Sequence, residues 1–185
     1  AKTNRFNTQP FLPRWRNQEK PDQAAAPKTT TASAMEQLAR IDPEELDQFI
    51  RRFAQVASQE QHKFGIPASI IIANGLLMST ADHSVLANDY HNFFRLPCGP
   101  FWEGEQVARE GQCYRVYSTA WLSFRDHSKY LVALREAAGV QLSSTDYQAW
   151  ARFLQQHNFA GEANLEQQLV QLIKDMELFY LDQKK

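Results

Sequence analysis

The sequence predicts a mainly α domain with a small β-hairpin lobe, preceded by an extended N-terminal arm. Two observations predict the domain: apolar residues recur at helical spacing through most of the chain after residue 42, and an alternating run near residue 114 follows two glycine turns. A third observation predicts the arm, because four of the eight prolines occur before residue 28. With 185 residues, the chain is long enough for one sizeable domain and too short for two ordinary ones.

Residues 1–34 differ in composition from the rest of the chain. They contain six basic and two acidic residues, whereas the remainder carries 14 basic and 19 acidic residues. Residues 23–34, rich in alanine and threonine, are typical of a linker. They have no large apolar side chains whose burial could offset the conformational entropy lost on ordering the segment. We therefore divide the chain into an extended arm and linker at residues 1–40 and a folded domain at residues 41–185.

The arm carries aromatic residues that prolines hold in extended geometry, which suits a short segment that docks onto a partner protein. A disordered tail is the alternative. The candidate partner-binding residues of the arm are Phe6, Phe11, Leu12 and Trp15.

The helices of the domain are predicted from apolar periodicity and from capping residues. Asp42 and Pro43 begin a helix that Gly65 ends. Pro67 begins a second helix, over residues 68–79, whose apolar residues lie on all sides and so predict a central position. Residues 81–98 show no regular pattern, and residues 101–117 predict the hairpin. Further helices are expected near 119–136, 144–157 and 164–180, with Thr145 and Asn164 near plausible caps.

Composition excludes several classes of function. A net charge of −1 argues against a general nucleic-acid binder, and no apolar stretch approaches the 18 residues of a membrane span. Two cysteines exclude a disulfide-rich scaffold and a four-thiolate zinc site. The five histidines include no pair at close ligand spacing on one helix, although His83 and His91 could meet. We expect no metal and no cofactor.

Short motifs follow one another in a fixed order between about Glu44 and Asp182. They are Gly65-Ile-Pro-Ala-Ser69, Ala73-Asn74, Leu77-Met78-Ser79, His91-Asn92-Phe93-Phe94-Arg95, Trp102-Glu103-Gly104, Cys113-Tyr-Arg-Val-Tyr117 and Ser123-Phe-Arg-Asp-His127. This order resembles the glucosaminidase domain of peptidoglycan hydrolases, a lysozyme-like family of flagellar and autolysin enzymes. The resemblance implies a lysozyme-like α+β fold, a bacterial origin and a place at the cell wall.

The sequence departs from the family pattern at the residues that would carry the chemistry. The resemblance implies that a glutamate after Leu77 protonates the glycosidic oxygen, yet Met78 stands there, and a thioether has no transferable proton. The tyrosine motif that lines the family's sugar site stands as Phe159-Ala-Gly-Glu-Ala163, and Gln112 replaces an acid before the hairpin cysteine. The resemblance therefore points to a form that lacks the catalytic glutamate.

From these departures we expect a catalytically inactive domain that serves as a binding or scaffold subunit of the bacterial cell envelope, mainly through protein partners. The candidate groove residues, for glycan or partner, are Met78, Asp82, His91, Asn92, Trp102 and Phe159. For Trp102 and Trp121, stacking on sugars and packing within the protein stay open.

Two alternatives also stay open. One is a peptidoglycan-binding module that does not cleave the glycan. The other is a peptidoglycan endo-beta-N-acetylglucosaminidase with a relocated general acid. Asp82, one helical turn beyond Met78, is the candidate for that acid, and Glu103, Glu105 and Glu110 on the hairpin are further carboxylates.

The family acts outside the reducing cytoplasm, where a disulfide can persist. Cys98 and Cys113 lie on either side of the hairpin, so we expect them to form a disulfide that crosslinks the β lobe. We also expect the chain to be exported to the periplasm or cell envelope, with its signal peptide removed ahead of Ala1.

Overall fold

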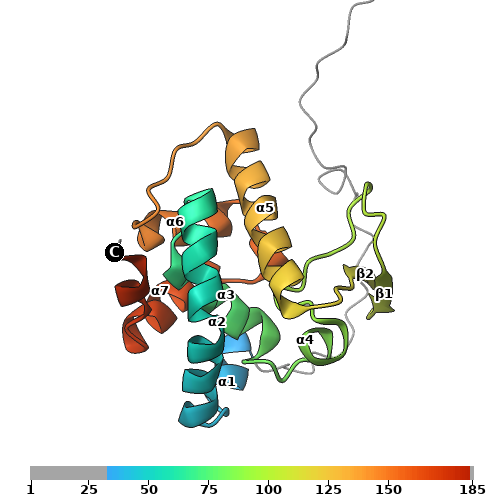
Figure 1. Ribbon diagram of the computed structural model, residues 1–185, viewed down its shortest axis with the longest axis horizontal. Helices are drawn as coiled ribbons and strands as arrows, with labels where there is room; N and C mark the ends of the chain where they lie inside the picture. The colour runs from blue at the N-terminus through green and yellow to red at the C-terminus, as the bar shows by residue number, and fades with distance from the viewer. Residues whose placement is uncertain (1–32, 184–185) are drawn as a thin grey trace, which may run out of the picture.

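The apolar helix expected over residues 68–79 is α3 (Ala68–Ser79), and every one of its residues is buried. In the computed structural model, which describes residues 33–183, the other helices surround it (Figure 1). A helix that is apolar on all sides needs cover on all sides. This cover comes from α1 (Ala34–Leu38), α2 (Pro43–Phe64), α6 (Tyr147–Gln156), α7 (Leu165–Asp175) and the 3-10 helix η3 (Leu178–Asp182).

The first long helix, α2, begins and ends where the sequence predicts. The side chain of Asp42 accepts a hydrogen bond from the backbone N–H of Glu44 at 2.8 Å, and Pro43 takes the first helical position. Gly65 ends the helix with a φ of 71°, a left-handed conformation that a residue without a Cβ adopts at no steric cost. Both predicted ends are confirmed.

The last helices differ from the sequence prediction at their ends. Asp146, not Thr145, caps α6 by accepting from the N–H of Ala149 at 2.9 Å, because the Thr145 hydroxyl pairs with that of Ser143 instead. Asn164 precedes α7, but its side chain makes no capping hydrogen bond. The single helix expected over 164–180 is divided at Met176 into α7 and η3.

Two further helices lie where none was expected. Helix α4 (Val85–Tyr90) lies within residues 81–98, which the sequence pattern left irregular; that prediction is wrong, because Ser84 caps a helix too short to show a period. Helix α1 lies within residues 1–40, where a capping box between Ser33 and Glu36 starts it and Leu38 is buried in the core. The arm residues Phe6, Phe11, Leu12 and Trp15 lie outside the described residues.

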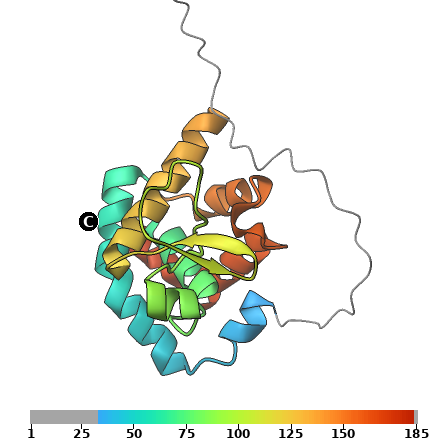
Figure 2. The same ribbon diagram turned by 90° about the vertical axis from the view of Figure 1, so that its right-hand side faces the viewer.

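The hairpin consists of β1 (Gln106–Arg109) and β2 (Gln112–Arg115), paired antiparallel with Gln106 opposite Arg115. It lies to one side of the helices, beside α4, and faces the viewer in Figure 2. The predicted disulfide is confirmed: Cys98 and Cys113 are joined, with their Cα atoms 5.4 Å apart. The fold class predicted from the sequence, mainly helical with one small hairpin, is likewise confirmed.

The first turn of α3 receives its cap from the far end of the described chain. Pro67 precedes the helix and makes no side-chain cap. Asp182, in η3, accepts hydrogen bonds from the backbone N–H of Ser69 at 2.8 Å and from its hydroxyl at 2.6 Å. Burial raises the pKa of Asp182, and the hydrogen bonds from Ser69 act in the opposite direction.

A long helix, α5 (Ala120–Ala138), packs against α2 and supplies one wall of the aromatic core. The rings of Phe53 and Phe124 stack with centroids 4.6 Å apart, and Phe93 contacts both. None of the helices between residues 33 and 183 is long and apolar enough to cross a membrane.

Candidate functional site

Met78 lies in the last turn of α3, and only 2% of its surface is exposed. The helix then ends in a tight turn in which Thr80, Ala81 and Asp82 all have positive φ values, of 52°, 50° and 77°. The Ser79 hydroxyl holds this turn, because it donates to the carbonyl of Gly75 at 2.6 Å and accepts from the N–H of Asp82 at 3.0 Å. The buried thioether at the end of α3 has no proton to transfer.

Asp82 faces α2. Its Oδ2 atom accepts a hydrogen bond from Nη1 of Arg52 at 2.8 Å, in a partly exposed ion pair. The neighbouring His83 contacts Glu45, also on α2, with its Nε2 atom 2.5 Å from the carboxylate, rather than meeting His91. His91 itself ends α4 with a φ of 51°. The structure therefore does not bring the two histidines together, and it engages the Asp82 carboxylate with a guanidinium.

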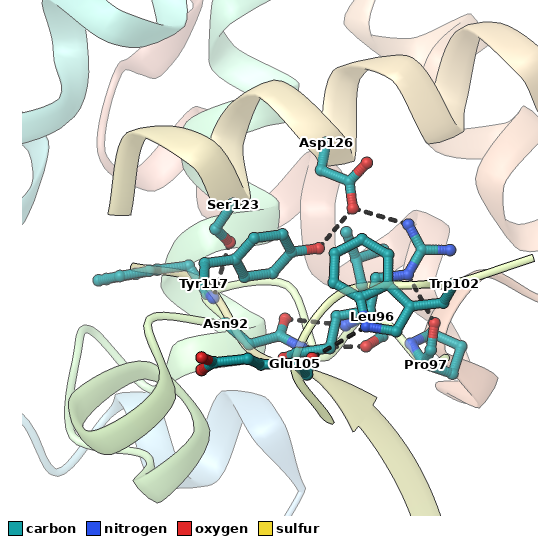
Figure 3. A network of polar contacts seen from close by, with 10 residues as sticks. Asn92, Leu96, Pro97, Trp102, Glu105, Tyr117, Ser123 and Asp126 are labelled. Carbon is teal, nitrogen blue, oxygen red and sulfur yellow. Dashed lines mark hydrogen bonds and ion pairs between the residues drawn. The ribbon is translucent and has the colours of Figure 1, made fainter. Parts of the chain in front are cut away.

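Asn92 is fully buried and connects the loop at residues 91–98 to the hairpin (Figure 3). Its Nδ2 atom donates to the carbonyls of Leu96 and Arg115, each at 2.9 Å. Its Oδ1 atom accepts from the N–H of Leu96, also at 2.9 Å. Since both amide N–H groups and the oxygen are used, Asn92 holds the backbone and has no free group for a ligand.

Asp126 of α5 anchors the base of the hairpin (Figure 3). Its Oδ2 atom accepts hydrogen bonds from the Tyr117 hydroxyl at 2.5 Å and from Nη1 of Arg115 at 2.6 Å. Arg115 also donates from Nε to the carbonyl of Pro97 at 2.9 Å. Burial raises the pKa of Tyr117, and the hydrogen bond to Asp126 adds to this effect. Tyr117 is therefore a neutral donor at ordinary pH.

Trp102 packs against this cluster. Its indole N–H donates to the carbonyl of Glu105 at 2.9 Å, its ring meets Tyr117 edge-on at 5.7 Å between centroids, and the Arg115 guanidinium carbon lies 4.8 Å from its centroid. Gly104 is needed here, because a Cβ at that position would lie 2.4 Å from the indole. These contacts favour packing for Trp102. Trp121 is 43% exposed, with the Arg125 guanidinium 4.7 Å from its ring.

Phe159 is buried in an aromatic layer with His127 and Phe94. The His127 ring stacks on Phe94 at 3.8 Å between centroids and meets Phe159 edge-on at 5.7 Å. Burial lowers the pKa of His127 to about 3, so this imidazole is neutral. Its Nε2 atom lies 3.5 Å from Nδ2 of Asn74, and within the described part of the chain neither His127 Nδ1 nor Asn74 Oδ1 has a hydrogen-bond partner.

Of the six candidate groove residues, the structure buries three (Met78, Asn92 and Phe159) and leaves three partly exposed (Asp82, His91 and Trp102). Sequence reasoning missed Asn74 and the cluster of Arg115, Tyr117 and Asp126 as site residues. The signal was present in two motifs quoted above, which contain the arginine, the tyrosine and the aspartate. Spacing alone does not show that one carboxylate receives both donors.

Among residues 33–183, no group of three or more His, Cys, Asp or Glu residues is placed to hold a metal ion.

Comparisons with known proteins connect this geometry to a family. The family model for glucosaminidase, described as mannosyl-glycoprotein endo-beta-N-acetylglucosaminidase, matches residues 54–178. No curated protein matches the sequence significantly.

Solved structures share the fold at low sequence identity. The catalytic domain of the autolysin Auto from Listeria monocytogenes is 18% identical with a TM-score of 0.59, and the similarity covers 78% of this chain and 92% of that one. The glycoside hydrolase domain of FlgJ from Salmonella typhimurium is 18% identical, with a TM-score of 0.57 and coverage of 76% and 91%. A peptidoglycan hydrolase from Sphingomonas sp. A1 is 21% identical, with a TM-score of 0.58 and coverage of 75% and 96%.

Proposed function

Because this chain belongs to the glucosaminidase family, whose model matches residues 54–178, we propose that it is a catalytically inactive member of that family. It serves as a binding or scaffold subunit in the bacterial cell envelope, chiefly through protein partners. This role places the domain outside the cytoplasm, in the periplasm or at the cell wall, where its disulfide between Cys98 and Cys113 persists.

Met78 carries the proposal. It stands where the family pattern has the glutamate that protonates the glycosidic oxygen, and general acid catalysis requires a group that holds and releases a proton there. The thioether of Met78 is buried in the last turn of α3 and fills space in the core. A hydrolytic mechanism would need another acid at the same bond.

The environments of the other carboxylates do not suit the role of such an acid. Asp82 is paired with Arg52 on α2. Glu103, Glu105 and Glu110 are exposed on the hairpin, whereas a carboxylic acid that keeps its proton near neutral pH needs an apolar, partly buried site. These environments favour the inactive domain over a hydrolase with a relocated acid.

Protein partners are favoured over glycan because the aromatic residues of the candidate groove are occupied within the fold. Phe159 is buried, and Trp102 uses its N–H and its ring within the protein. On the outer surface, the adjacent Trp121 and Leu122 at the start of α5 are exposed. Aromatic residues of this kind are enriched where proteins bind proteins.

The test is muropeptide release from purified sacculi, measured by mass spectrometry beside an active relative. We expect no sugar-containing fragments above the blank, while the active relative releases them. Fragments above the blank would contradict inactivity and direct attention to Asp82 and the hairpin glutamates.

Co-sedimentation with sacculi then separates the two binding roles. A protein-binding subunit stays near background in the pellet. Strong co-sedimentation without release would instead support a peptidoglycan-binding module that does not cleave.

A further inference from the structure

The loop that leads into the hairpin and the hairpin itself carry an excess of exposed acid. Residues 99–112, which we call the acidic lobe, contain three glutamates and one basic residue. Glu103, Glu105 and Glu110 are all exposed, and within the described part of the chain none of them forms an ion pair. The basic residue, Arg109, lies over an aromatic ring of α4. The lobe is therefore a negatively charged surface to one side of the helices (Figure 1).

The acidic lobe also presents a large apolar side chain to solvent. Phe101 is 75% exposed, the highest value among the large apolar residues between positions 33 and 183. The backbone around it is held, because the N–H of Trp102 donates to the carbonyl of Gly99 at 3.1 Å and its indole N–H donates to that of Glu105 at 2.9 Å. The disulfide of Cys98 fixes the chain just ahead of the lobe. A held, exposed aromatic beside carboxylates suits a segment that is both basic and aromatic.

The arm of the same chain has these complementary properties. Residues 5–16, ahead of the described region, contain three arginines and no acidic residue. They also contain Phe6, Phe11 and Trp15. Two prolines among them favour an extended backbone, which reduces the entropy lost on docking. The charge and the aromatic residues of this segment both match the acidic lobe.

The linker is long enough for such a contact. Ser33 comes 17 residues after Arg16, and an extended chain of that length spans about 55–60 Å. A compact domain of this size has a diameter of roughly 40 Å. Since the arm is joined covalently to the domain, even a contact that would be weak between separate molecules is sufficient to hold it.

Charge favours the acidic lobe over the other exposed aromatic surface of the domain. Trp121 is 43% exposed, but the Arg125 guanidinium lies 4.7 Å from its ring centroid. Lys63 lies 5.6 Å from the ring of Phe64, which Arg125 also contacts. Glu60, the partner of Arg125, is fully buried, so the charges nearest the surface are cationic. An arginine-rich segment is repelled there and attracted to the lobe.

We propose that residues 5–16 dock onto the acidic lobe of their own chain. Arg14 and Arg16 pair with the exposed glutamates of the lobe, and an aromatic residue of the arm packs on Phe101. This contact goes beyond the proposed function and does not depend on whether the domain cleaves glycan. It holds on the domain the same aromatic residues that are expected to bind a partner protein, so a partner must displace them from the lobe.

The experiment is paramagnetic relaxation enhancement, measured by NMR on the full chain. Both native cysteines are in the disulfide, so Thr8→Cys supplies a single thiol for a nitroxide label. The amide signals of Phe101, Glu103 and Glu105 should be broadened at about 0.05 M salt and should recover at about 0.5 M, where exposed charges are screened. Unbroadened lobe signals at low salt would overturn the proposal, as would broadening confined to the surroundings of Trp121.

Charge reversal tests the pairing itself. Arg14→Glu with Arg16→Glu should lower the enhancement at the lobe roughly three- to tenfold, because two exposed attractions become repulsions. Glu103→Arg with Glu105→Arg should do the same, and the four changes together should restore the broadening. The control is Glu136→Arg, at an exposed position of α5 outside the lobe, which should behave like wild type. No recovery in the fourfold variant would overturn the pairing.

A mixed sample separates docking within one chain from docking between two copies. Spin-labelled protein without isotope label is mixed with isotope-labelled protein that has no spin label. The lobe signals of the isotope-labelled copy should stay sharp. Broadening equal to that of the singly prepared, doubly labelled chain would assign the contact to a second copy and overturn docking within the chain.

Discussion

Tyr117 donates its phenolic hydrogen to Oδ2 of Asp126 over 2.5 Å, and the same oxygen also receives Nη1 of Arg115. One carboxylate oxygen of α5 therefore holds two donors from the base of the hairpin. Neither donor is fully exposed, so both depend on this acceptor.

Replacing Asp126 should therefore cost more than replacing either donor. Asp126→Ala leaves a guanidinium and a hydroxyl without their shared acceptor, and we expect the free energy of unfolding to fall by about 2–4 kcal/mol. Tyr117→Phe removes one hydrogen bond and should cost about 1 kcal/mol. Urea unfolding curves at neutral pH measure both. An Asp126→Ala cost no greater than that of Tyr117→Phe would show that the hairpin does not depend on the shared acceptor.

His127 should make the fold sensitive to acid. Its pKa in the folded protein is about 3, below its ordinary 6.5, so between these values the unfolded chain binds a proton that the folded protein does not. Above pH 6.5 His127 is neutral in both the folded and the unfolded state, so its titration does not lower stability. As the pH falls from 6.5 towards 3, the unfolded chain takes up the proton, and the free energy of unfolding falls by a few kcal/mol.

Urea midpoints between pH 7 and pH 4 check this effect. In His127→Phe, which can still stack on Phe94, stability should fall less over this range than in wild type. His62→Gln, at an exposed position of α2, shows what loss of a surface histidine does. An equal fall in wild type and His127→Phe would assign the acid sensitivity to other groups.

The disulfide should stabilise the domain as a whole. Closing the 15-residue separation between Cys98 and Cys113 restricts the unfolded chain, which corresponds to about 3 kcal/mol in the chain-entropy model. Cys98→Ser with Cys113→Ser should lose about this amount in chemical unfolding. Wild type with a reductant should lose the same amount, and a thiol count on denatured, unreduced protein should find none. Identical unfolding curves with and without reductant would contradict the prediction.

The fold should tolerate an apolar replacement of Met78 but should be destabilised by an acidic one. Met78→Leu conserves volume and should cost less than about 1.5 kcal/mol. Met78→Glu buries a carboxyl group beside the core and should cost at least about 2 kcal/mol.

The same acidic variant tests whether a glutamate at position 78 is enough to give hydrolysis. If the domain is inactive as proposed, Met78→Glu should release no muropeptides, because Phe159 and Gln112 are further expected departures from the family pattern. Release by this variant would show that the remaining face can still hold and cleave glycan.

Local signals explain which parts of the fold could be predicted from the sequence. The ends of α2 could be predicted because the residues that set them, Asp42, Pro43 and Gly65, lie within a few positions of those ends. The central position of α3 could be predicted because its residues are apolar on every side. The disulfide followed from the family resemblance and from the two cysteines around the hairpin. Helix α4 was missed because six residues are too few to display a period.

The site was harder to predict, because a residue type does not reveal burial or partners. Asn92 and Phe159 were candidates for binding, yet one holds backbone groups and the other packs on His127. Arg95 belongs to one of the quoted motifs, but its ion-pair partner Glu162 lies 67 residues away and could not be identified from the sequence. Only tertiary structure brings these pairs together.

The cap that Asp182 provides to α3 has a consequence for protein synthesis. A ribosome adds Ser69 113 residues before Asp182, which at ordinary translation speeds is a delay of roughly 6–20 seconds. During that delay the most apolar segment of the chain has neither its cap nor its cover from α6 and α7. Until those later helices are synthesised, the segment exposes apolar surface of the kind that chaperones bind.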